Sequence, residues 1–304
     1  MASERAFTRG LRRFFGAARG VTIGIGDDAA VVRNAAANAV LCCDPVVEGV
    51  HFRRGDPPDL VGRKAVNRNL SDLAAMGALA DWLLVSLVLP KDYPARSRQR
   101  LLRGIRSAAR AGRCTVVGGD VATHRGPLVV TVTAVGHLPG RALVRSGARA
   151  GDTLHVTGPL GGSLHGHHLR FRPALREGAW LARQRAVTAA MDVSDGLLLD
   201  LATLLLASGG LGAELDAAAI PIRAAARRHA RNAADALRHA LGDGEDHVLL
   251  WTQRPRPRLA PGGPLAATAR TPIGRVTARP GLWLVHADGR RERVAPAGFE
   301  HRLR

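Results

Sequence analysis

The chain has 304 residues, which is long enough for two domains that each bury a hydrophobic core. Its 46% hydrophobic and 23% charged residues exclude a disordered or fibrous protein. The formal net charge is +19 and comes almost entirely from arginine, because Lys64 and Lys91 are the only lysines. Such a charge permits binding of phosphorylated ligands or RNA, but the arginines are scattered and no aromatic residues alternate with them to stack on bases. Nucleic-acid binding is therefore not expected.

The cysteines, Cys42, Cys43 and Cys114, suit a reducing compartment, since their odd number and spacing give neither a disulfide framework nor a CxxC metal motif. The start of the chain lacks the apolar run of a signal peptide, and no run of about 18 apolar residues occurs elsewhere. These features predict a cytoplasmic protein without a membrane segment.

The chain begins with two short predicted elements. Residues 3–15 carry apolar side chains at helical spacing and predict an amphipathic helix. Residues 21–32 predict a strand, a sharp turn and a second strand, with Asp27 and Asp28 at the tip of the turn. Because apolar segments flank this turn on both sides, its carboxylates are candidates for a metal site.

A strand is next predicted from residue 39 to Asp44, because Pro45 favours an extended exit from it. Helical spacing then predicts a helix over 58–76, although Asn69, Ser71 and Asp72 lie inside it. Interior Asn and Asp are poor helix formers, so a constraint other than helicity is indicated. The rest of the first half is predicted as a buried strand at 82–89, a helix at 95–111, a strand at 115–121 that leads into Gly119 and Asp120, and a strand at 128–135.

Gly, Pro and Arg dominate residues 136–151, and we place a domain boundary there, with domains 1–138 and 139–304. The second half is predicted to begin with a strand at 153–156 and a helix around 179–183, followed by the stretch AMDVSDG at 190–196. A helix at 197–208, a strand at 213–215 and a basic helix at 223–239 come next. The chain then continues with a buried strand after Asp246, an irregular loop at 253–270 and strands at 272–276 and 282–285. This mixture predicts an α+β class.

Aspartates recur at the ends of these elements, and none has His or Cys at zinc-ligand spacing. In AMDVSDG, Asp192 and Asp195 flank Ser194 and precede a glycine, which suits a turn that holds a hard cation. Dispersed carboxylates beside glycines are what Mg²⁺ and a nucleoside triphosphate require. No nucleophile–base pair stands out, so a covalent mechanism is not indicated.

Seven motifs follow one another in the order GIGDDAAVV, DPVVEGVHF, KAVNRNLSDLAAMGA, VVGGD, LVRSGARAGDTLHVTG, AMDVSDGLLLDL and GDGEDHVLLWT. Together they resemble the thiamine-monophosphate kinase family, of the superfamily that includes aminoimidazole ribonucleotide synthetase and selenophosphate synthetase. The resemblance implies ATP-dependent phosphorylation of thiamine monophosphate to thiamine diphosphate by direct in-line transfer. It also implies a homodimer and a two-domain aminoimidazole ribonucleotide synthetase-like α/β (α+β) fold, with mixed sheets packed with helices and the site between the domains.

The resemblance further implies roles for individual residues. The implied Mg²⁺ set is Asp28, Asp44, Asp72, Asp120, Asp192 and Asp195, together with the positions of Cys42 and Cys43. Asp195, Asp192 and Asp120 would carry the catalysis. ATP would be contacted by Gly119, Asp120, Arg145 and Ser194, and the acceptor by His51, Glu245 and Phe299.

Two departures from the family pattern bear on the acceptor and the metal. Cys42 and Cys43 stand where the family usually has a hydroxyl pair, and thiols are poor ligands for a hard ion unless the backbone carbonyls act instead. Asp243 and His247 stand where a glycine and an aromatic residue are usual.

Two alternatives remain open. One is another ATP-dependent enzyme of the superfamily with a different acceptor, although a selenophosphate synthetase would need a reactive cysteine before Cys42, and none is present. The other is a catalytically impaired binding protein, for which the net charge would suit RNA.

Overall fold

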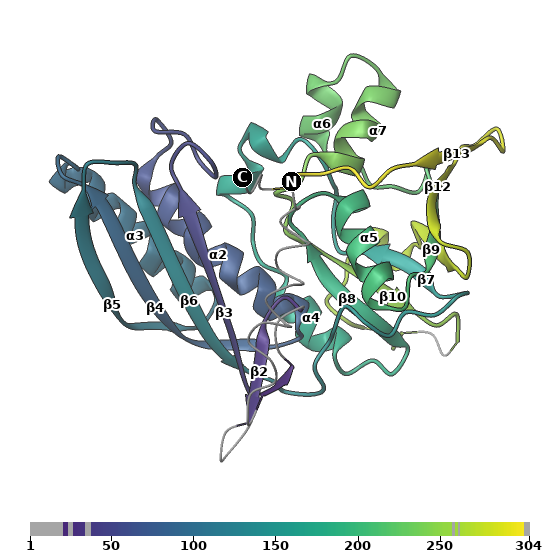
Figure 1. Cartoon of the computed structure of the whole chain (residues 1–304), viewed down its shortest axis with the longest axis horizontal. Helices are drawn as coiled ribbons and strands as arrows, with labels where there is room; N and C mark the ends of the chain where they lie inside the picture. Colours follow the sequence, from purple (N-terminus) through teal and green to yellow (C-terminus); the bar gives the residue numbers. More distant parts are fainter. Residues whose placement is uncertain (1–20, 24–26, 34–37, 257–258, 261, 301–304) are drawn as a thin grey trace.

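The computed structural model describes residues 21–23, 27–33, 38–256, 259–260 and 262–300. Two sheets follow one another along the chain, and helices pack against each (Figure 1). The helix predicted at 3–15 lies outside the described residues. Among the described helices, none is both long and apolar enough to span a membrane.

The first sheet has the strand order β1-β2-β3-β6-β4-β5. Its strands are β1 (Val21–Ile23), β2 (Ala30–Arg33), β3 (Asn38–Val47), β4 (Leu79–Pro90), β5 (Thr115–His124) and β6 (Val129–His137). The pair β4–β5 is parallel, and the other neighbours are antiparallel. The predicted strand–turn–strand at 21–32 is confirmed as the antiparallel pair β1–β2.

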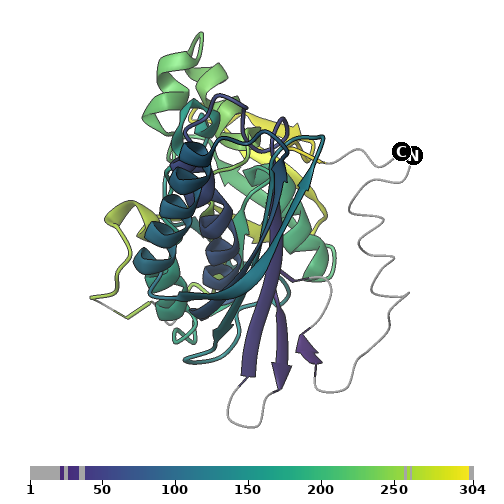
Figure 2. The ribbon, with the colours of Figure 1, turned by 90° about the vertical axis from the view of Figure 1, so that its left-hand side faces the viewer.

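Two helices, α2 (Pro58–Ala75) and α3 (Ala95–Ala111), lie together on one face of this sheet (Figure 2). Both helices match the sequence prediction within one residue. They approach closely because Gly104 faces α2: a Cβ at Gly104 would lie 1.9 Å from the carbonyl oxygen of Asp59. Glycine is required there to let the two backbones meet.

The outer face of the first sheet has no described helix over it. The segment predicted as a buried strand at 82–89 is buried on one face only, because alternate residues of β4 point to opposite sides. Leu83 and Leu87 are buried, whereas Trp82 is 54% exposed and Leu84 is 44% exposed. All of β5 is exposed except its last residue, since β5 forms the edge of the sheet.

β3 also differs from its prediction. It continues through Asp44 and Pro45 to Val47. A proline is tolerated here because β2 pairs with β3 only from Asn38 to Leu41, so Pro45 has a strand partner on one side alone.

The second sheet has the order β13-β12-β9-β11-β7-β10-β8, in which only β12–β9 is parallel among the described pairs. Its strands are β7 (Thr153–Val156), β8 (Val187–Val193), β9 (Gly212–Asp216), β10 (Val248–Gln253), β11 (Gly274–Thr277), β12 (Gly281–Val285) and β13 (Arg291–Val294). The helical elements are η1 (Ser163–His165), η2 (His167–Leu169), α4 (Leu175–Leu181), α5 (Leu197–Ala207), α6 (Ala224–His229), α7 (Ala233–Gly242) and α8 (Ala267–Arg270).

The basic helix predicted at 223–239 is wrong, because two helices, α6 and α7, occupy this region. Asn232 lies between them in an extended conformation, and its side chain accepts a hydrogen bond from the backbone N–H of Asp235. A capped helix start of this kind ends the preceding helix. Strand β13 was not predicted, and the loop at 253–270 contains the short helix α8.

The two halves meet along α2, which packs against α4, β8 and β10 (Figure 1). The chain passes from the first sheet to the second between His137 and Thr153. The domain limits 1–138 and 139–304 stay a prediction. The contact along α2 brings residues of both halves to one place.

Candidate functional site

Three buried or partly buried carboxylates meet where the halves join. Asp28 lies before β2, Asp72 on α2 and Asp192 on β8, and one oxygen of each lies within 4.8 Å of the others. Among the described residues, no other group of three or more acids, histidines or cysteines is as tightly gathered. The structure thus joins predicted metal ligands from three separate motifs.

Asp28 forms a two-pronged ion pair with Arg145. The Nε and Nη2 atoms of Arg145 donate to the two carboxylate oxygens at 2.9 and 2.8 Å. The Asp28 side chain is only 2% exposed, and burial raises its pKa to about 6 even though Arg145 acts in the opposite direction. Arg145 also donates its backbone N–H to Asp27, which fixes the turn.

Asp72 is repelled by the other acids around it. Burial raises its pKa well above the usual range, and the charges of Asp44, Asp192 and Asp28 raise it further. Acids this close together do not all ionise unless a cation is present. The cluster is therefore built for a positive charge.

Asp192 is the member of the cluster whose pKa is lowered. Burial alone would raise its pKa, but His247 and a hydrogen bond from Ser71 outweigh burial and lower it. Ser71 Oγ donates to the carboxylate at 2.6 Å, and His247 Nδ1 lies 3.4 Å from it. Ser71 and Asp72 inside α2 therefore serve the site between the halves. This is the constraint other than helicity that their presence in a helix indicated.

The two cysteines lie on opposite faces of β3. Cys42 is buried, and its thiol donates to the carbonyl oxygen of Asn69 at 3.3 Å. Burial, with Asp72 and Asp44, raises the pKa of Cys42 well above its usual value, so it stays a neutral thiol. Cys43 is exposed on the other face, where Thr133 donates to its sulfur. The side chains of successive residues in a strand point to opposite faces of the sheet. Only Cys42 therefore faces the acids, and the two cysteine side chains do not lie together as a pair of ligands.

The remaining first-half aspartate near the cluster, Asp44, is held from two sides. Its backbone N–H donates to Asn69 Oδ1 at 3.0 Å, and Arg68 Nη2 lies 3.4 Å from its carboxylate. Asp44 is half-exposed. Neither Asp44 nor Asp195 belongs to the group of three.

The turn after β8 is organised by Asp200, which the sequence analysis missed. One of its oxygens accepts the backbone N–H groups of Ser194, Asp195 and Gly196, at 3.0, 2.9 and 3.1 Å. Gly196 has φ of +124°, a conformation that side chains rarely allow. An acidic residue in the first turn of a helix, as in the sequence SDGLLLD, is the signal that could have found Asp200.

The backbone of the same turn is hydrogen-bonded to two of the residues predicted to bind the phosphate acceptor, Glu245 and Phe299. The carbonyl of Ser194 accepts the N–H of Glu245 at 2.6 Å, and the carbonyl of Asp195 accepts the N–H of Phe299 at 2.8 Å. Phe299 is 50% exposed. Ser194, Asp195, Glu245 and Phe299 therefore lie together on the second half.

Glu245 is surrounded by cations. Its carboxylate lies 2.9 Å from Lys64 Nζ, 3.4 Å from Arg68 Nη1 and 3.2 Å from His247 Nε2. Burial opposes ionisation, but His247, Lys64 and Arg68 together lower the pKa of Glu245. Lys64 and Arg68 were not predicted as site residues, and His247 was noted only as a departure from the family pattern.

His247 links the two sides of the site. It is buried between Asp192 and Glu245, and its ring stacks on Phe171 with centroids 4.1 Å apart. Burial lowers the pKa of His247, but the two carboxylates outweigh this and raise it. His51, from the first half, is held at its ring, where Nδ1 accepts the N–H of Val47 at 3.0 Å.

Gly119 and Asp120 are not brought to the cluster. They lie on the exposed edge strand β5, and β6 and β4 separate β5 from β3. At the usual spacing between strands, this places β5 about 14 Å from β3. Gly119 has no room for a side chain, since a Cβ would meet the carbonyl oxygen of Val85 at 1.8 Å. Within one chain, the strand order keeps Asp120 apart from the other aspartates, and its metal role stays a prediction.

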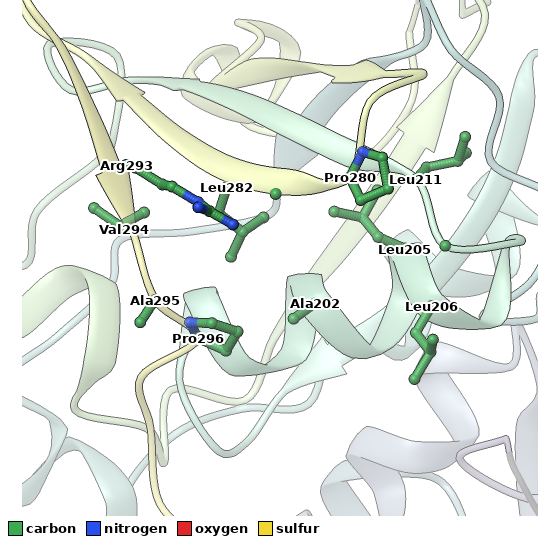
Figure 3. Close-up of a pocket in the computed structure, with 12 residues that line it drawn as sticks. Ala202, Leu205, Leu206, Leu211, Pro280, Leu282, Arg293, Val294, Ala295 and Pro296 are labelled. Atoms are coloured by element: carbon green, nitrogen blue, oxygen red, sulfur yellow. The ribbon is translucent and has the colours of Figure 1, made fainter.

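A separate apolar groove of about 590 Å³ lies between α5 and the strands β12 and β13 (Figure 3). Leu205, Leu282 and Pro296 line it, and Arg293 is its charged residue. None of the predicted site residues lines this groove, so it is not part of the site.

Family models match almost all of the first half and much of the second. The model for "AIR synthase related protein, N-terminal domain" matches residues 26–138, and that for the C-terminal domain matches residues 139–240. The thiamine-monophosphate kinase of Rhodopirellula baltica is 39% identical over 291 residues, which cover 92% of each chain. That of Aquifex aeolicus is 33% identical over 296 residues, covering 91% of this chain and 92% of its own. This chain belongs to the thiamine-monophosphate kinase family.

A solved member of this family has the same fold. The structure of AaThiL complexed with AMPPCP and TMP covers 98% of this chain and 97% of its own, with a TM-score of 0.85 and 29% identity. The two-domain fold of mixed sheets and helices predicted from the sequence is thereby confirmed.

Proposed function

We propose that this chain transfers the γ-phosphoryl group of ATP to thiamine monophosphate and so forms thiamine diphosphate. The observation that carries this is the cluster of Asp28, Asp72 and Asp192, built from both halves of a thiamine-monophosphate kinase family chain. AaThiL, which binds AMPPCP, an ATP analogue, together with TMP, supports both substrates.

The cluster fits Mg²⁺. Its donors are carboxylate oxygens within 4.8 Å of one another, and burial together with the neighbouring acids raises the pKa of Asp72, which a bound cation would relieve. Asp44 and Asp195 would complete the binding of further ions. We assign no side-chain contact to Cys42 or Cys43, because the first is a neutral thiol and the second points away. Bound Mg²⁺ would neutralise the phosphates and help to orient them.

The protein groups would act by positioning, since no covalent nucleophile is needed for in-line transfer. Asp192 and Asp195 would hold the phosphates in place through the metal, and Ser194 would contact ATP. Arg145 pairs with Asp28 through Nε and Nη2, and its other N–H groups would donate to the triphosphate. His51 from one half and Glu245 and Phe299 from the other would bind the acceptor.

We further propose a homodimer that completes the site. The outer face of the first sheet and its edge strand β5 together expose large apolar residues, which monomeric proteins rarely do. They are Trp82, Leu84, Val116, Val117 and Val121. Gly119 and Asp120 lie on the same edge, so pairing of two copies would carry the partner subunit's Asp120 toward the other copy's acids.

A coupled assay of ADP release tests the function. Thiamine monophosphate, thiamine and no acceptor are compared with ATP and Mg²⁺ present, and ADP is expected only with the monophosphate. Asp195→Asn is expected to abolish this release. Equal release with and without acceptor, or full turnover by the Asn variant, would contradict the proposal.

A further inference from the structure

Lys64 is a buried lysine in a chain that uses arginine almost everywhere else. It lies on the first half of α2 and has no exposed surface. Its ammonium nitrogen lies 2.6 Å from the carbonyl oxygen of His51, 3.1 Å from His168 Nδ1 and 2.9 Å from the Glu245 carboxylate. A lysine without solvent contact is costly unless it is fully paired, and here each of its three N–H groups has one acceptor.

The three acceptors come from three segments of the fold. His51 follows β3 in the first half, whereas His168 lies in η2 and Glu245 precedes β10 in the second half. Lys64 therefore bridges the halves at the acceptor side of the site, away from the acid cluster. The residues that it joins directly, His51 and Glu245, are those proposed to bind the acceptor from opposite sides.

His168 is suited to accept a hydrogen bond from Lys64, because its ring is not a second positive charge. Burial and the neighbouring Lys64 lower its pKa to about 4, so the ring is neutral at physiological pH. A neutral imidazole offers one ring nitrogen as an acceptor, and Nδ1 is the nitrogen that faces Lys64.

We propose that Lys64 is a positioning residue that fixes the separation of His51 and Glu245 and so shapes the thiamine monophosphate site. This inference rests on the proposed function. A compact ammonium meets three converging acceptors, whereas the flat guanidinium of arginine presents its donors in a fixed plane and needs more room. The contacts of Lys64 are with residues proposed to bind the acceptor and with His168, and none is with a residue proposed to bind ATP, so its effect is expected on the acceptor.

Calorimetric binding tests the role without relying on turnover. Lys64→Met is expected to weaken thiamine monophosphate binding about tenfold or more, the effect of losing a charge-assisted hydrogen bond, and to leave AMPPCP binding unchanged. Lys64→Arg is expected to resemble Lys64→Met. Lys91→Met, at the other lysine, which is exposed, is the matched control and should bind both ligands as the unsubstituted protein does. Equal weakening of both ligands, or normal acceptor binding by either Lys64 variant, would overturn the proposal.

A double-mutant cycle with Glu245→Gln separates positioning from simple loss of stability. If Lys64 acts through Glu245, the two substitutions together weaken acceptor binding by less than the product of their separate effects. Strictly multiplicative effects would contradict it.

Amine labelling followed by mass spectrometry tests the bridge independently of any ligand. Lys91 is expected to react rapidly and Lys64 to resist, and Glu245→Gln should speed the labelling of Lys64. If Lys64 reacts as fast as Lys91, the bridge is wrong whatever the protein's activity. If Lys64 is protected but the unsubstituted protein binds no thiamine monophosphate, the bridge stands, and both the proposed function and the acceptor role of Lys64 fail.

Discussion

Ser71, on α2 of the first half, donates a hydrogen bond of 2.6 Å to the carboxylate of Asp192, on β8 of the second half. The two residues are 121 positions apart in the chain, and both are buried. This bond ties the halves together at the acid cluster and helps to keep Asp192 ionised. A residue that a helix does not favour is therefore used for a contact between domains.

Ser71→Ala is expected to lower the free energy of unfolding by about 1–3 kcal/mol, because a buried charged acceptor loses a partner. It should also reduce the stabilisation that Mg²⁺ gives, since Asp192 is then ionised less readily. Denaturant unfolding with and without Mg²⁺ measures both effects. Ser107→Ala, at an exposed serine of α3, is the control. Equal losses in the two variants would show that the bond is unimportant.

Asp72→Asn should change stability in opposite directions with and without metal. Its folded pKa is raised, so above the unfolded value of about 3.8 the carboxyl destabilises the fold, and this penalty grows as pH rises. Asn removes the penalty, and the metal-free variant is expected to melt at a higher temperature at pH 7.5. The variant should no longer be stabilised by Mg²⁺, and its kcat should fall about 100-fold or more.

Thermal melts of the protein treated with EDTA and then titrated with Mg²⁺ measure this contrast. Asp59→Asn is the matched control, since Asp59 is on the same helix but pairs at the surface with Arg100. A metal-free Asp72→Asn protein that is less stable than the parent would mean that repulsion among the acids does not destabilise the metal-free fold.

Much of the fold was predictable because local patterns decide it. Helix α3 and strand β7 have the predicted bounds, Ala95–Ala111 and Thr153–Val156, since apolar periodicity and flanking breakers mark both. The break between α6 and α7 was not predicted, because no Gly or Pro interrupts the basic run around Asn232. The exposed face of β4 was missed because WLLVSLVL reads as apolar throughout, and only a missing covering layer exposes Trp82.

The site was predictable as a set of motifs but not as a geometry. The family resemblance chose Asp28, Asp72 and Asp192, which the fold brings together. It could not show that β6 and β4 separate Asp120 from them, because strand order is a property of the whole chain. Lys64 had one overlooked signal: lysine stands inside an apolar helix in a chain that uses arginine almost everywhere else.

Val117→Glu tests the proposed homodimer. Val117 is 58% exposed on β5, and a charge there would be buried without a partner if two copies pair through this face. Sedimentation is expected to show a dimer for the parent and a monomer for the variant, with most kinase activity lost because the partner subunit's Asp120 is absent. Leu206→Glu, at a 57% exposed leucine of α5, is the control and should leave the dimer intact. A fully active monomer would contradict the shared site.

We expect His155 to contribute to the loss of stability in acid. It is buried on β7, and its ring stacks on Trp251 with centroids 5.1 Å apart. Burial lowers the pKa of His155 from 6.5 to about 4. Between these values the unfolded chain binds a proton that the folded chain does not, so folding is favoured more as pH rises and less as pH falls. The neutral ring of His155 therefore gives its full contribution to the free energy of unfolding above about pH 6.5, and this contribution is lost by about pH 4. The loss amounts to roughly 3 kcal/mol at most.

His155→Gln cannot take up this proton, so its stability should depend less on pH across the same window. Urea unfolding at intervals from pH 4.5 to 7.5 is expected to give a steeper rise for the parent than for His155→Gln. His124→Gln, at the end of the edge strand β5, makes the same substitution elsewhere in the chain and serves as the comparison variant. Parallel curves for the parent and His155→Gln would mean that His155 titrates normally in the folded protein, and that another group causes any loss of stability in acid.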